Sequence, residues 1–388
     1  MKNILLYYSF SFSFGGGEHL PLSFIAALQR MGNLTVALDM EPNLEKSSKL
    51  FGIDIDMAGL KVVQVTPSGY DPRKHDWLAS YHRSRHLRKL AEEADICISC
   101  ANIMDFGKPA HHFINMLAFG DDAFTDFAHN RVDDIPVKAS GKAKRFLSDC
   151  VRPILGMRSK KSIIKDRKEH IYPNSHFVER LMTDYYGPFN STVFYPPTLF
   201  EARQSNVLRD PLKIVYIGRI VPEKRIMDII GIAEKAREIS GLDIKLHIAG
   251  RMNQVPSYGK RLLEMEEKRD WLKFVGELYG QAKEDFLLSG SYALHTERFE
   301  AFGISIGEYL KSGIITIVPD VGGAREIVDS SELSFQTNEE AASILSKLLT
   351  DRDFREKQRE HCLQRADYFS RGKYMERQQN LLNEIIAP

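Results

Sequence analysis

The chain has 388 residues, a hydrophobic fraction of 43%, a charged fraction of 27% and a formal net charge of +1 at pH 7. These values are typical of a soluble protein with two domains of ordinary size, and the small net charge gives no general attraction to nucleic acid. The sequence contains no run of eighteen apolar residues, so it predicts no membrane-spanning helix. The apolar stretch at residues 4–8 is short and lacks a small-residue cleavage site, and we expect a cytoplasmic protein.

The first half of the chain alternates predicted strands and helices. Strands are expected at residues 3–8, 34–38 and 61–65 and around Cys97, and helices at residues 18–30 and 77–93. This alternation predicts a parallel sheet covered by helices, which is an α/β fold. The prolines that follow Tyr195 suit a linker, so we expect the first domain to cover residues 1–196.

Three glycines, Gly15, Gly16 and Gly17, stand between the first strand and the first helix. With Asp39 at the end of the second strand, they could form a dinucleotide site, and the protein would then be an NAD-dependent oxidoreductase. However, the glycines lack the G-x-G-x-x-G spacing, and the loop at residues 9–14 is too long for the tight turn of that motif. The oxidoreductase stays a minor alternative.

The residue types of Cys97, Cys100, His111 and His112 would suit zinc. The residues around Cys97 predict a buried strand, and its alternation would send the two thiols to opposite faces. Four cysteines are also too few for a disulfide framework. We expect reduced core cysteines and no metal site.

A second alternation of strands and helices begins at Lys213. Strands are expected at residues 213–217, 246–250, 274–276, 292–295 and 314–318. They predict a second Rossmann-like domain over residues 212–370.

Two cations follow the first strand of this second domain. Pro222 predicts the first position of a helix, which places Lys224 in the first turn. A cation there opposes the helix dipole unless an anion compensates it. A diphosphate would satisfy both Lys224 and the nearby Arg219.

Two carboxylates, Glu300 and Glu308, flank the start of another predicted helix. This helix is expected to begin near Phe302 and to end at Gly313 in the left-handed conformation. The backbone N–H groups of Phe302, Gly303 and Ile304 would then bind an anion. Glu308 on the second turn could accept hydrogen bonds from ribose hydroxyls, and Glu300 would meet the sugar.

These motifs together resemble the retaining glycosyltransferases of family 4, which have the two-domain GT-B fold. The shared pattern comprises Gly218-Arg219, Glu223-Lys224, Glu300-x7-Glu308, Gly322-Gly323 and Glu326. The resemblance covers essentially the whole chain. It implies that Arg219 and Lys224 hold the donor diphosphate, that Glu300 contacts the donor sugar and that Glu308 holds the ribose. It also implies two Rossmann-like domains facing across a cleft, with a C-terminal helix, about residues 371–388, crossing back to the first domain.

Further contacts are expected on both domains. The resemblance implies that Gly16 and Gly17 face the donor diphosphate and that a residue of the first domain touches the sugar, either His112 or Asn115. The nucleotide base is expected near Arg251 and the backbone of Leu278.

The sequence therefore predicts an enzyme that moves a hexose-type sugar from a nucleoside diphosphate sugar to a glycan or lipid-linked acceptor. The resemblance implies retention of the anomeric configuration, and without an Asp-x-Asp motif we expect no metal and no other cofactor. A nucleotide-sugar epimerase of the same fold, which needs no acceptor, is an alternative. A binding protein that has lost turnover is disfavoured by the intact charged set.

A basic segment, residues 138–168, has eleven Lys or Arg against two Asp, with apolar residues such as Ile163 and Ile164 between them. This composition predicts contact with an anionic membrane surface, which would place the protein on the inner face of the membrane. A solvated loop and helix without a partner is an equally good interpretation.

Overall fold

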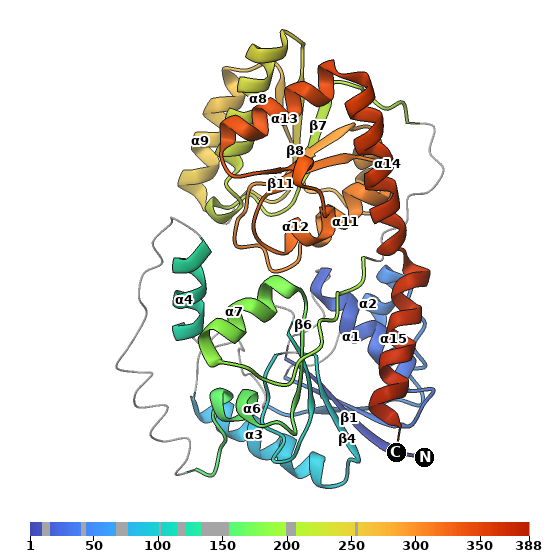
Figure 1. Cartoon of the computed structure of the whole chain (residues 1–388). Coiled ribbons are helices and arrows are strands. Elements are labelled where there is room, and N and C mark those ends of the chain that lie inside the picture. The colour runs from blue at the N-terminus through green and yellow to red at the C-terminus, as the bar shows by residue number, and fades with distance from the viewer. Residues whose placement is uncertain are drawn as a thin grey trace. The chain divides into compact units, whose positions relative to one another are not determined.

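The computed structural model describes residues 1–9, 16–39, 44–66, 77–100, 102–114, 122–132, 155–198, 207–252 and 255–387. The chain forms two compact units (Figure 1). The first unit comprises Met1–Pro197 together with Met375–Pro388, and the second comprises Thr198–Tyr374. The sequence prediction set the corresponding boundaries at residues 196, 212 and 370.

The first unit is built on a parallel sheet whose described strands follow the order β3-β2-β1-β4-β5-β6. These strands are β1 (Asn3–Tyr8), β2 (Asn33–Leu38), β3 (Lys61–Gln64), β4 (Ile96–Ser99), β5 (His111–Ile114) and β6 (His170–Pro173). Strand β1 lies in the middle and is buried from Ile4 to Tyr8. A continuous apolar run is what a strand needs when helices cover both faces of its sheet.

The described helices of the first unit are α1 (His19–Leu28), α2 (Leu44–Phe51), α3 (Trp77–Glu92), α4 (Asp122–Val132), α6 (Lys160–Lys165) and α7 (His176–Tyr186). Two of them begin at serine caps, because Ser159 accepts a hydrogen bond from the Ser162 N–H and Ser175 accepts one from the Val178 N–H.

The last helix, α15 (Arg371–Ile386), returns to the first unit from Met375 onwards, as predicted (Figure 1). Lys2 Nζ donates to the Ile386 carbonyl at 2.7 Å, and Gln378 Nε2 donates to Ser23 Oγ on α1 at 3.2 Å. These bonds join the two ends of the chain within one unit.

The second unit repeats the same strand order. Its described strands run β12-β11-β10-β7-β8-β9, so the fourth strand again lies beside the first. They are β7 (Lys213–Ile217), β8 (Lys245–Ala249), β9 (Leu272–Gly276), β10 (Tyr292–Leu294), β11 (Ile315–Pro319) and β12 (Ser334–Phe335). The predicted α/β fold with two Rossmann-like units is confirmed.

The described helices of the second unit are α8 (Ile226–Ser240), α9 (Pro256–Glu267), α10 (Gly280–Leu288), α11 (Ile304–Lys311), α12 (Gly323–Val328), α13 (Asn338–Thr350) and α14 (Arg352–Tyr368). Helix α8 packs with α13, and α11 packs with α14 (Figure 1). No helix in the described ranges is long and apolar enough to cross a membrane.

The prediction of a helix starting at Pro222 is wrong. Residues Pro222–Lys224 form a short 3-10 turn, Arg225 has the left-handed conformation with φ 51°, and α8 begins at Ile226. The hydroxyl of Thr296 donates to the carbonyls of Lys224 and Arg225 at 3.0 and 3.2 Å, which holds the turn in this shape. Lys224 therefore stands before α8 and not in its first turn.

Candidate active site

The predicted charged residues of the second unit follow two neighbouring strands. Strand β7 pairs with β10 in parallel, at the point where the strand order reverses. Ligands of open α/β sheets bind beyond the carboxyl ends of the strands at such a point. The loop after β7 carries Arg219 and Lys224, and the loop after β10 carries Glu300.

The loop after β7 is held by the loop after β8. Gly218 N–H donates to the Ala249 carbonyl at 3.1 Å, and Ile220 N–H donates to the Arg251 carbonyl at 3.0 Å. Gly250 has φ +154°, and a Cβ there would lie 1.8 Å from the Gly218 carbonyl oxygen, so only glycine fits.

Arg219 projects from this fixed loop with an exposed side chain. Within the described ranges no residue forms a hydrogen bond or ion pair with its guanidinium. Arg219 is therefore available to an anionic ligand.

Glycines also shape the loop after β10. Gly303 caps α11 with φ 99°, in the left-handed region that favours glycine. Gly323 N–H donates to the Glu300 carbonyl at 2.7 Å, and a Cβ on Gly323 would lie 2.2 Å from the Ala301 carbonyl oxygen. Gly323 thus lets the start of α12 pack against the backbone next to Glu300.

Helix α11 begins at Ile304, two residues later than predicted, and Gly313 follows it in the predicted left-handed conformation with φ +68°. In the described structure no backbone carbonyl accepts a hydrogen bond from the N–H groups of Gly303 or Ile304. The start of this helix can therefore bind an anion through its backbone. The side chain of Phe302 instead packs in the core, with its ring 5.9 Å from that of Phe369.

Tyr309 fixes α11 to the end of β7, a role that the sequence did not reveal. Its hydroxyl accepts from the Ile217 N–H at 2.7 Å and donates to the Ile217 carbonyl at 3.2 Å. The side chain is fully buried. Because Ile217 directly precedes Gly218 and Arg219, this contact sets α11 against the loop that carries the arginine.

Lys224 lies between two carboxylates. Its Nζ forms an ion pair with Glu300 Oε2 at 2.7 Å and a second ion pair with Glu297. The side chains of Lys224, Glu297 and Glu300 are 16%, 14% and 18% exposed. Burial alone would lower the pKa of Lys224, but the two carboxylates raise it above its ordinary value, so the lysine is charged.

His295, at the end of β10, adds a neutral group to this cluster. Its Nε2 is 3.9 Å from Glu300 Oε2, and burial lowers the pKa of His295 to about 4. Ligand atoms of His295, Glu297 and Glu300 lie within 4.8 Å of one another, which is a spacing that could hold a metal ion. The ammonium of Lys224 already supplies a cation between the two carboxylates.

Glu308 also has a cationic partner that sequence reasoning missed. Its Oε1 accepts from Lys283 Nζ on α10 at 2.7 Å. The other oxygen, Oε2, has no hydrogen-bond partner among the residues that the structure describes. Lys283 thus orients the carboxylate and leaves one oxygen for a ligand.

The predicted base contacts lie at the same edge of the sheet, after β8 and β9. Arg251 Nε pairs with Glu277 Oε1 at 2.9 Å, and the Tyr279 hydroxyl donates to the same oxygen at 3.0 Å. Leu278 lies between Glu277 and Tyr279 in the chain.

The remaining predicted site residues belong to the first unit. Gly16 and Gly17 form a 3-10 turn with Glu18 before α1. Asn115 lies outside the described residues. Contacts of these three residues with a donor stay predictions.

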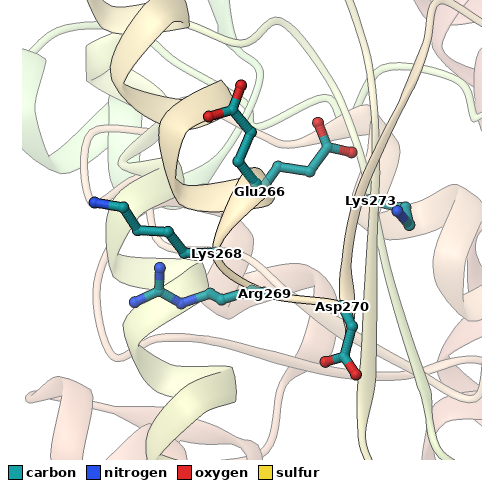
Figure 2. Close-up of a pocket in the computed structure, with 6 residues that line it drawn as sticks. Glu266, Lys268, Arg269, Asp270 and Lys273 are labelled. Atoms are coloured by element: carbon teal, nitrogen blue, oxygen red, sulfur yellow. The ribbon is translucent and has the colours of Figure 1, made fainter.

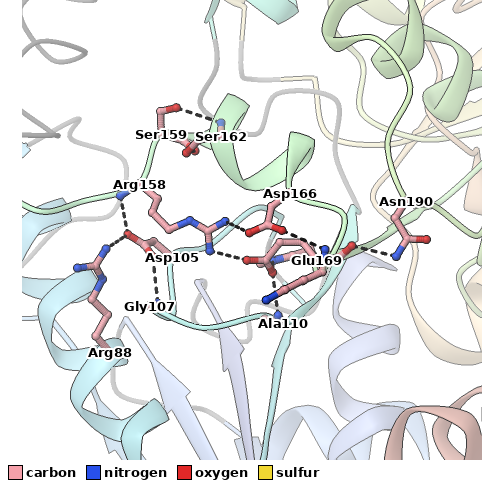
Figure 3. A network of polar contacts seen from close by, with 12 residues as sticks. Arg88, Asp105, Gly107, Ala110, Arg158, Ser159, Ser162, Asp166, Glu169 and Asn190 are labelled. Atoms are coloured by element: carbon pink, nitrogen blue, oxygen red, sulfur yellow. Dashed lines mark hydrogen bonds and ion pairs between the residues drawn. The ribbon is translucent and has the colours of Figure 1, made fainter.

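His112 is fully buried in a polar network. Met104 N–H donates to its Nδ1 at 3.4 Å, and its Nε2 lies 3.0 Å from Glu169 Oε2. Glu169 also accepts from Ala110 N–H at 2.7 Å and pairs with Arg158 at 2.6 Å (Figure 3). Both ring nitrogens are thus engaged, and a sugar contact by His112 would need one of these bonds to break.

Asp39, which could have held the ribose of NAD, is also committed within the first unit. Its Oδ2 accepts from the Tyr7 hydroxyl at 2.9 Å and pairs with Arg83 at 2.7 Å, and the residue is fully buried. Its Oδ1 has no hydrogen-bond partner among the described residues, but the residue is fully buried, and this burial disfavours the oxidoreductase alternative.

A surface hollow of about 590 Å³ lies between the end of α9 and the start of β9 (Figure 2). Its lining is entirely charged and comes from the end of α9 and the start of β9: Glu266, Glu267, Lys268, Arg269, Asp270 and Lys273. Arg269 pairs with Glu234, and Glu266 accepts from the Phe274 N–H. These contacts stabilise the fold at the amino end of β9, opposite the edge where ligands bind.

Comparisons with known proteins agree with this geometry. Residues 200–365 match the family model of glycosyl transferases group 1. No curated protein sequence matches the chain.

Solved structures of similar fold cover the whole chain. The glycosyltransferase WaaG, involved in lipopolysaccharide biosynthesis, has 13% identity and a TM-score of 0.68, with 100% of both chains covered. Sucrose-phosphate synthase from Thermosynechococcus elongatus has the same identity, TM-score and coverage. Anabaena Alr3699/HepE in complex with UDP-glucose has 14% identity and a TM-score of 0.65, with 99% of this chain and 100% of that chain covered. The chain therefore has the GT-B fold, and residues 200–365, which carry the candidate site, match the group 1 glycosyl transferases.

Proposed function

We propose that the protein is a glycosyltransferase that uses a nucleoside diphosphate sugar as donor. The observation that carries the proposal is the arrangement of Arg219, Lys224, Glu300 and Glu308 at the carboxyl ends of β7 and β10, within the segment that matches the group 1 family model. The neighbour HepE, which binds UDP-glucose, makes UDP the first nucleotide to test.

The roles of the residues follow from their surroundings. The exposed Arg219, the ammonium of Lys224 and the N–H groups at the start of α11 would hold the diphosphate and stabilise the charge that develops when it leaves. Each preorganised donor of this kind contributes about 3 kcal/mol to the transition state. Glu308 would bind the ribose through Oε2, while Lys283 holds Oε1.

Glu300 is better suited to orient the donor sugar than to attack it. Its Oε2 is paired with Lys224, which lowers its nucleophilicity and fixes its direction. We propose retention of the anomeric configuration and a hexose-type donor sugar, in line with the resemblance to glycosyltransferase family 4. Because the protein's own cations can neutralise the leaving diphosphate, the proposed reaction needs no metal ion.

Thermal unfolding with UDP, GDP and ADP tests the donor. A nucleotide at one hundred times its dissociation constant stabilises the native protein by about 2.7 kcal/mol. Arg219→Ala should reduce the shift strongly, whereas the control Lys260→Ala, which changes an exposed residue on α9, should not. If none of the three nucleotides raises the melting temperature, the proposed donor is wrong.

The fate of the donor sugar separates transferase from epimerase. An epimerase would convert the donor sugar without an acceptor, whereas a transferase would release the nucleoside diphosphate and extend an acceptor. NMR of the reaction with and without glycan acceptors distinguishes the two, and the anomeric signal of the product reports retention or inversion.

We further propose a glycan or lipid-linked acceptor, reached at an anionic membrane surface. Ile163 and Ile164 of the basic segment are buried in the fold, so the contact would be made by the exposed lysines around them. Reversing the exposed Lys161 and Lys165 to Glu should weaken binding to anionic vesicles by about thirtyfold or more, because each cation near such a surface contributes about 1 kcal/mol. Unchanged vesicle binding would leave these lysines as solvated residues without a partner.

A further inference from the structure

Glu297 is a second carboxylate in the Lys224 cluster, and no role has yet been assigned to it. It stands three residues before Glu300 in the loop after β10, and its carboxylate pairs with the same ammonium. One lysine needs only one carboxylate for neutrality. The cluster therefore carries an excess negative charge whenever both glutamates are ionised.

A shared proton removes this excess. Both carboxyl groups contact the ammonium of Lys224, and their ligand atoms lie within 4.8 Å of each other, so a proton on one of them can be shared with the other by a hydrogen bond. Two carboxyl groups this close do not ionise independently, because the first negative charge opposes the second. With one proton, the cluster of Lys224, Glu297 and Glu300 is neutral.

The charge of this cluster matters for an anionic donor. A diphosphate that approaches Lys224 must draw the ammonium partly away from its carboxylates. With both glutamates ionised, the diphosphate would meet a net negative charge and would leave two unpaired carboxylates behind. With one glutamate protonated, the second acid stays hydrogen-bonded to the first, and Lys224 can turn to the diphosphate at lower cost.

We propose that Glu297 is a positioning residue of the donor site, which in its protonated form holds Glu300 by a hydrogen bond and so makes Lys224 available to the donor diphosphate. The inference rests on the proposed function and deepens it, because it makes donor binding depend on a proton. The proton comes from solvent and stays on the carboxyl pair while the diphosphate is bound.

The groups that face Glu297 support the direction of this effect. Burial and the adjacent Glu300 raise the pKa of Glu297 to about 8, although Lys224 opposes the shift. His295, at the end of β10, is neutral because burial lowers its pKa to about 4. Tyr216 of β7 is also neutral, because burial and then Glu297 raise its pKa well above the ordinary value. Lys224 and Glu300 are thus the charged groups, among those described, that set the titration of Glu297.

The test compares the wild type with Glu297→Gln over pH 7 to 9.5. The probe is UDP, or GDP or ADP if that nucleotide gives the larger thermal shift, and the measurement is its dissociation constant by calorimetry. Because the second pKa of a phosphate monoester is about 6, the phosphates of the probe change little in charge above pH 7. Any titration of the base affects both variants alike, so the result is the ratio of the wild-type dissociation constant to that of Glu297→Gln at each pH. Glu223→Gln is the matched control, since it neutralises the exposed glutamate next to Lys224 in the chain.

In the wild type we expect the dissociation constant to be flat up to about pH 8 and then to rise, by up to about tenfold per pH unit, because binding requires one proton. Glu297→Gln mimics the protonated acid, so its dissociation constant should stay within about threefold of the wild-type value at pH 7 across the whole range. The Glu223→Gln control should retain the wild-type pH profile.

A second readout uses the protein without nucleotide. A carboxyl group whose folded pKa is raised binds its proton more tightly in the native state, so the wild type should lose stability relative to Glu297→Gln as pH rises from about 4.5 to about 8, with no further loss above that. If Glu297→Gln folds poorly, Glu297→Met takes its place, because it also removes the titrating group.

The outcomes are distinguishable. If the wild type binds the nucleotide with the same pH profile as Glu297→Gln, the role of Glu297 is wrong and the proposed donor stands. If the wild type binds none of the three nucleotides even at pH 7, the proposed donor fails and this inference fails with it.

Discussion

Replacing Glu300 with Ala separates its role from that of Glu308. In the wild type at pH 7, one proton on the carboxyl pair makes the Lys224 cluster neutral. Burial and then Glu300 raise the pKa of Glu297, and Lys224 lowers it. In Glu300→Ala the repulsion from Glu300 is gone while the contact with Lys224 remains, so we expect Glu297 to ionise and the cluster to be neutral again. The affinity for UDP should therefore change by less than about threefold, which is about 0.65 kcal/mol.

Turnover should fall much further in the same variant. If Glu300 orients the sugar in the transition state, its loss should cost about 3 kcal/mol, which is a decrease in turnover of about a hundredfold or more. Glu308→Ala should instead weaken UDP binding, because a hydrogen bond to a charged group contributes about 1.5–3 kcal/mol, or roughly 10- to 150-fold.

Calorimetry with UDP and the rate of UDP release from the donor measure the two effects. The double variant Glu297→Gln with Glu300→Ala adds a sharper check, because it leaves Lys224 without an ionised partner in the cluster. It should bind UDP about tenfold more tightly than the wild type. This corresponds to about 1.5 kcal/mol, the lower end of the range for a hydrogen bond to a charged group. A loss of UDP affinity in Glu300→Ala as large as that in Glu308→Ala would refute the charge balance on which this reasoning depends.

Two further changes test the supports of the site. Lys283→Met removes the 2.7 Å ion pair with the buried Glu308. We expect the Michaelis constant for the donor to rise about fivefold, which is about 1 kcal/mol, with little change in turnover. Lys283→Arg should restore most of the donor affinity. Gly250→Ala places a Cβ against the Gly218 carbonyl at positive φ and should destabilise the protein by about 2–4 kcal/mol, whereas Gly231→Ala, in an open position of α8, should stabilise it by about 0.5–1 kcal/mol. Denaturant unfolding measures the free energy of unfolding of both glycine variants. Equal changes in the two variants would contradict the argument.

The fold could be predicted from the sequence because its signals are local. Apolar runs such as residues 3–8 and 213–217 mark central strands, and their alternation with helices leaves little choice of sheet type. The left-handed end of α11 at Gly313 was predictable for the same reason, since glycine at that position is a local preference.

The error at Pro222 shows where local signals fail. Proline favours the first position of a helix, but here the hydroxyl of Thr296, 72 residues from Lys224, donates to the carbonyls of the turn, and the helix begins only at Ile226. Similarly, the sequence shows Ile163 and Ile164 as apolar residues within a basic segment, and the structure shows that they pack in the core. A sequence pattern shows that a face is apolar, but not which surface covers it.

The site residues that the sequence analysis missed all pair with residues that are distant in the chain. Glu297 lies 73 residues from its partner Lys224, and Tyr309 lies 92 residues from Ile217. Lys283 is 25 residues from Glu308, on a different helix. No spacing rule connects such pairs, because the sheet topology alone brings them together.

The donor site, as the second unit presents it, is nearly neutral, and this has a consequence for how it would bind an anion. Lys224 and Lys283 are each paired with carboxylates, so a ligand gains less from them than from cations that are free in water. In exchange, the ion pairs fix the direction of both ammonium groups before the ligand arrives, which is the condition for stabilising a charge that develops during a reaction. Arg219 is exposed and has no such partner among the described residues, so it would make the first contact with the diphosphate. Lys224 would then contact the diphosphate while the proton stays on the carboxyl pair of Glu297 and Glu300. The site would thus bind the donor weakly in the ground state, while its fixed cations stabilise the charge of the transition state. This combination favours turnover over tight binding of the donor.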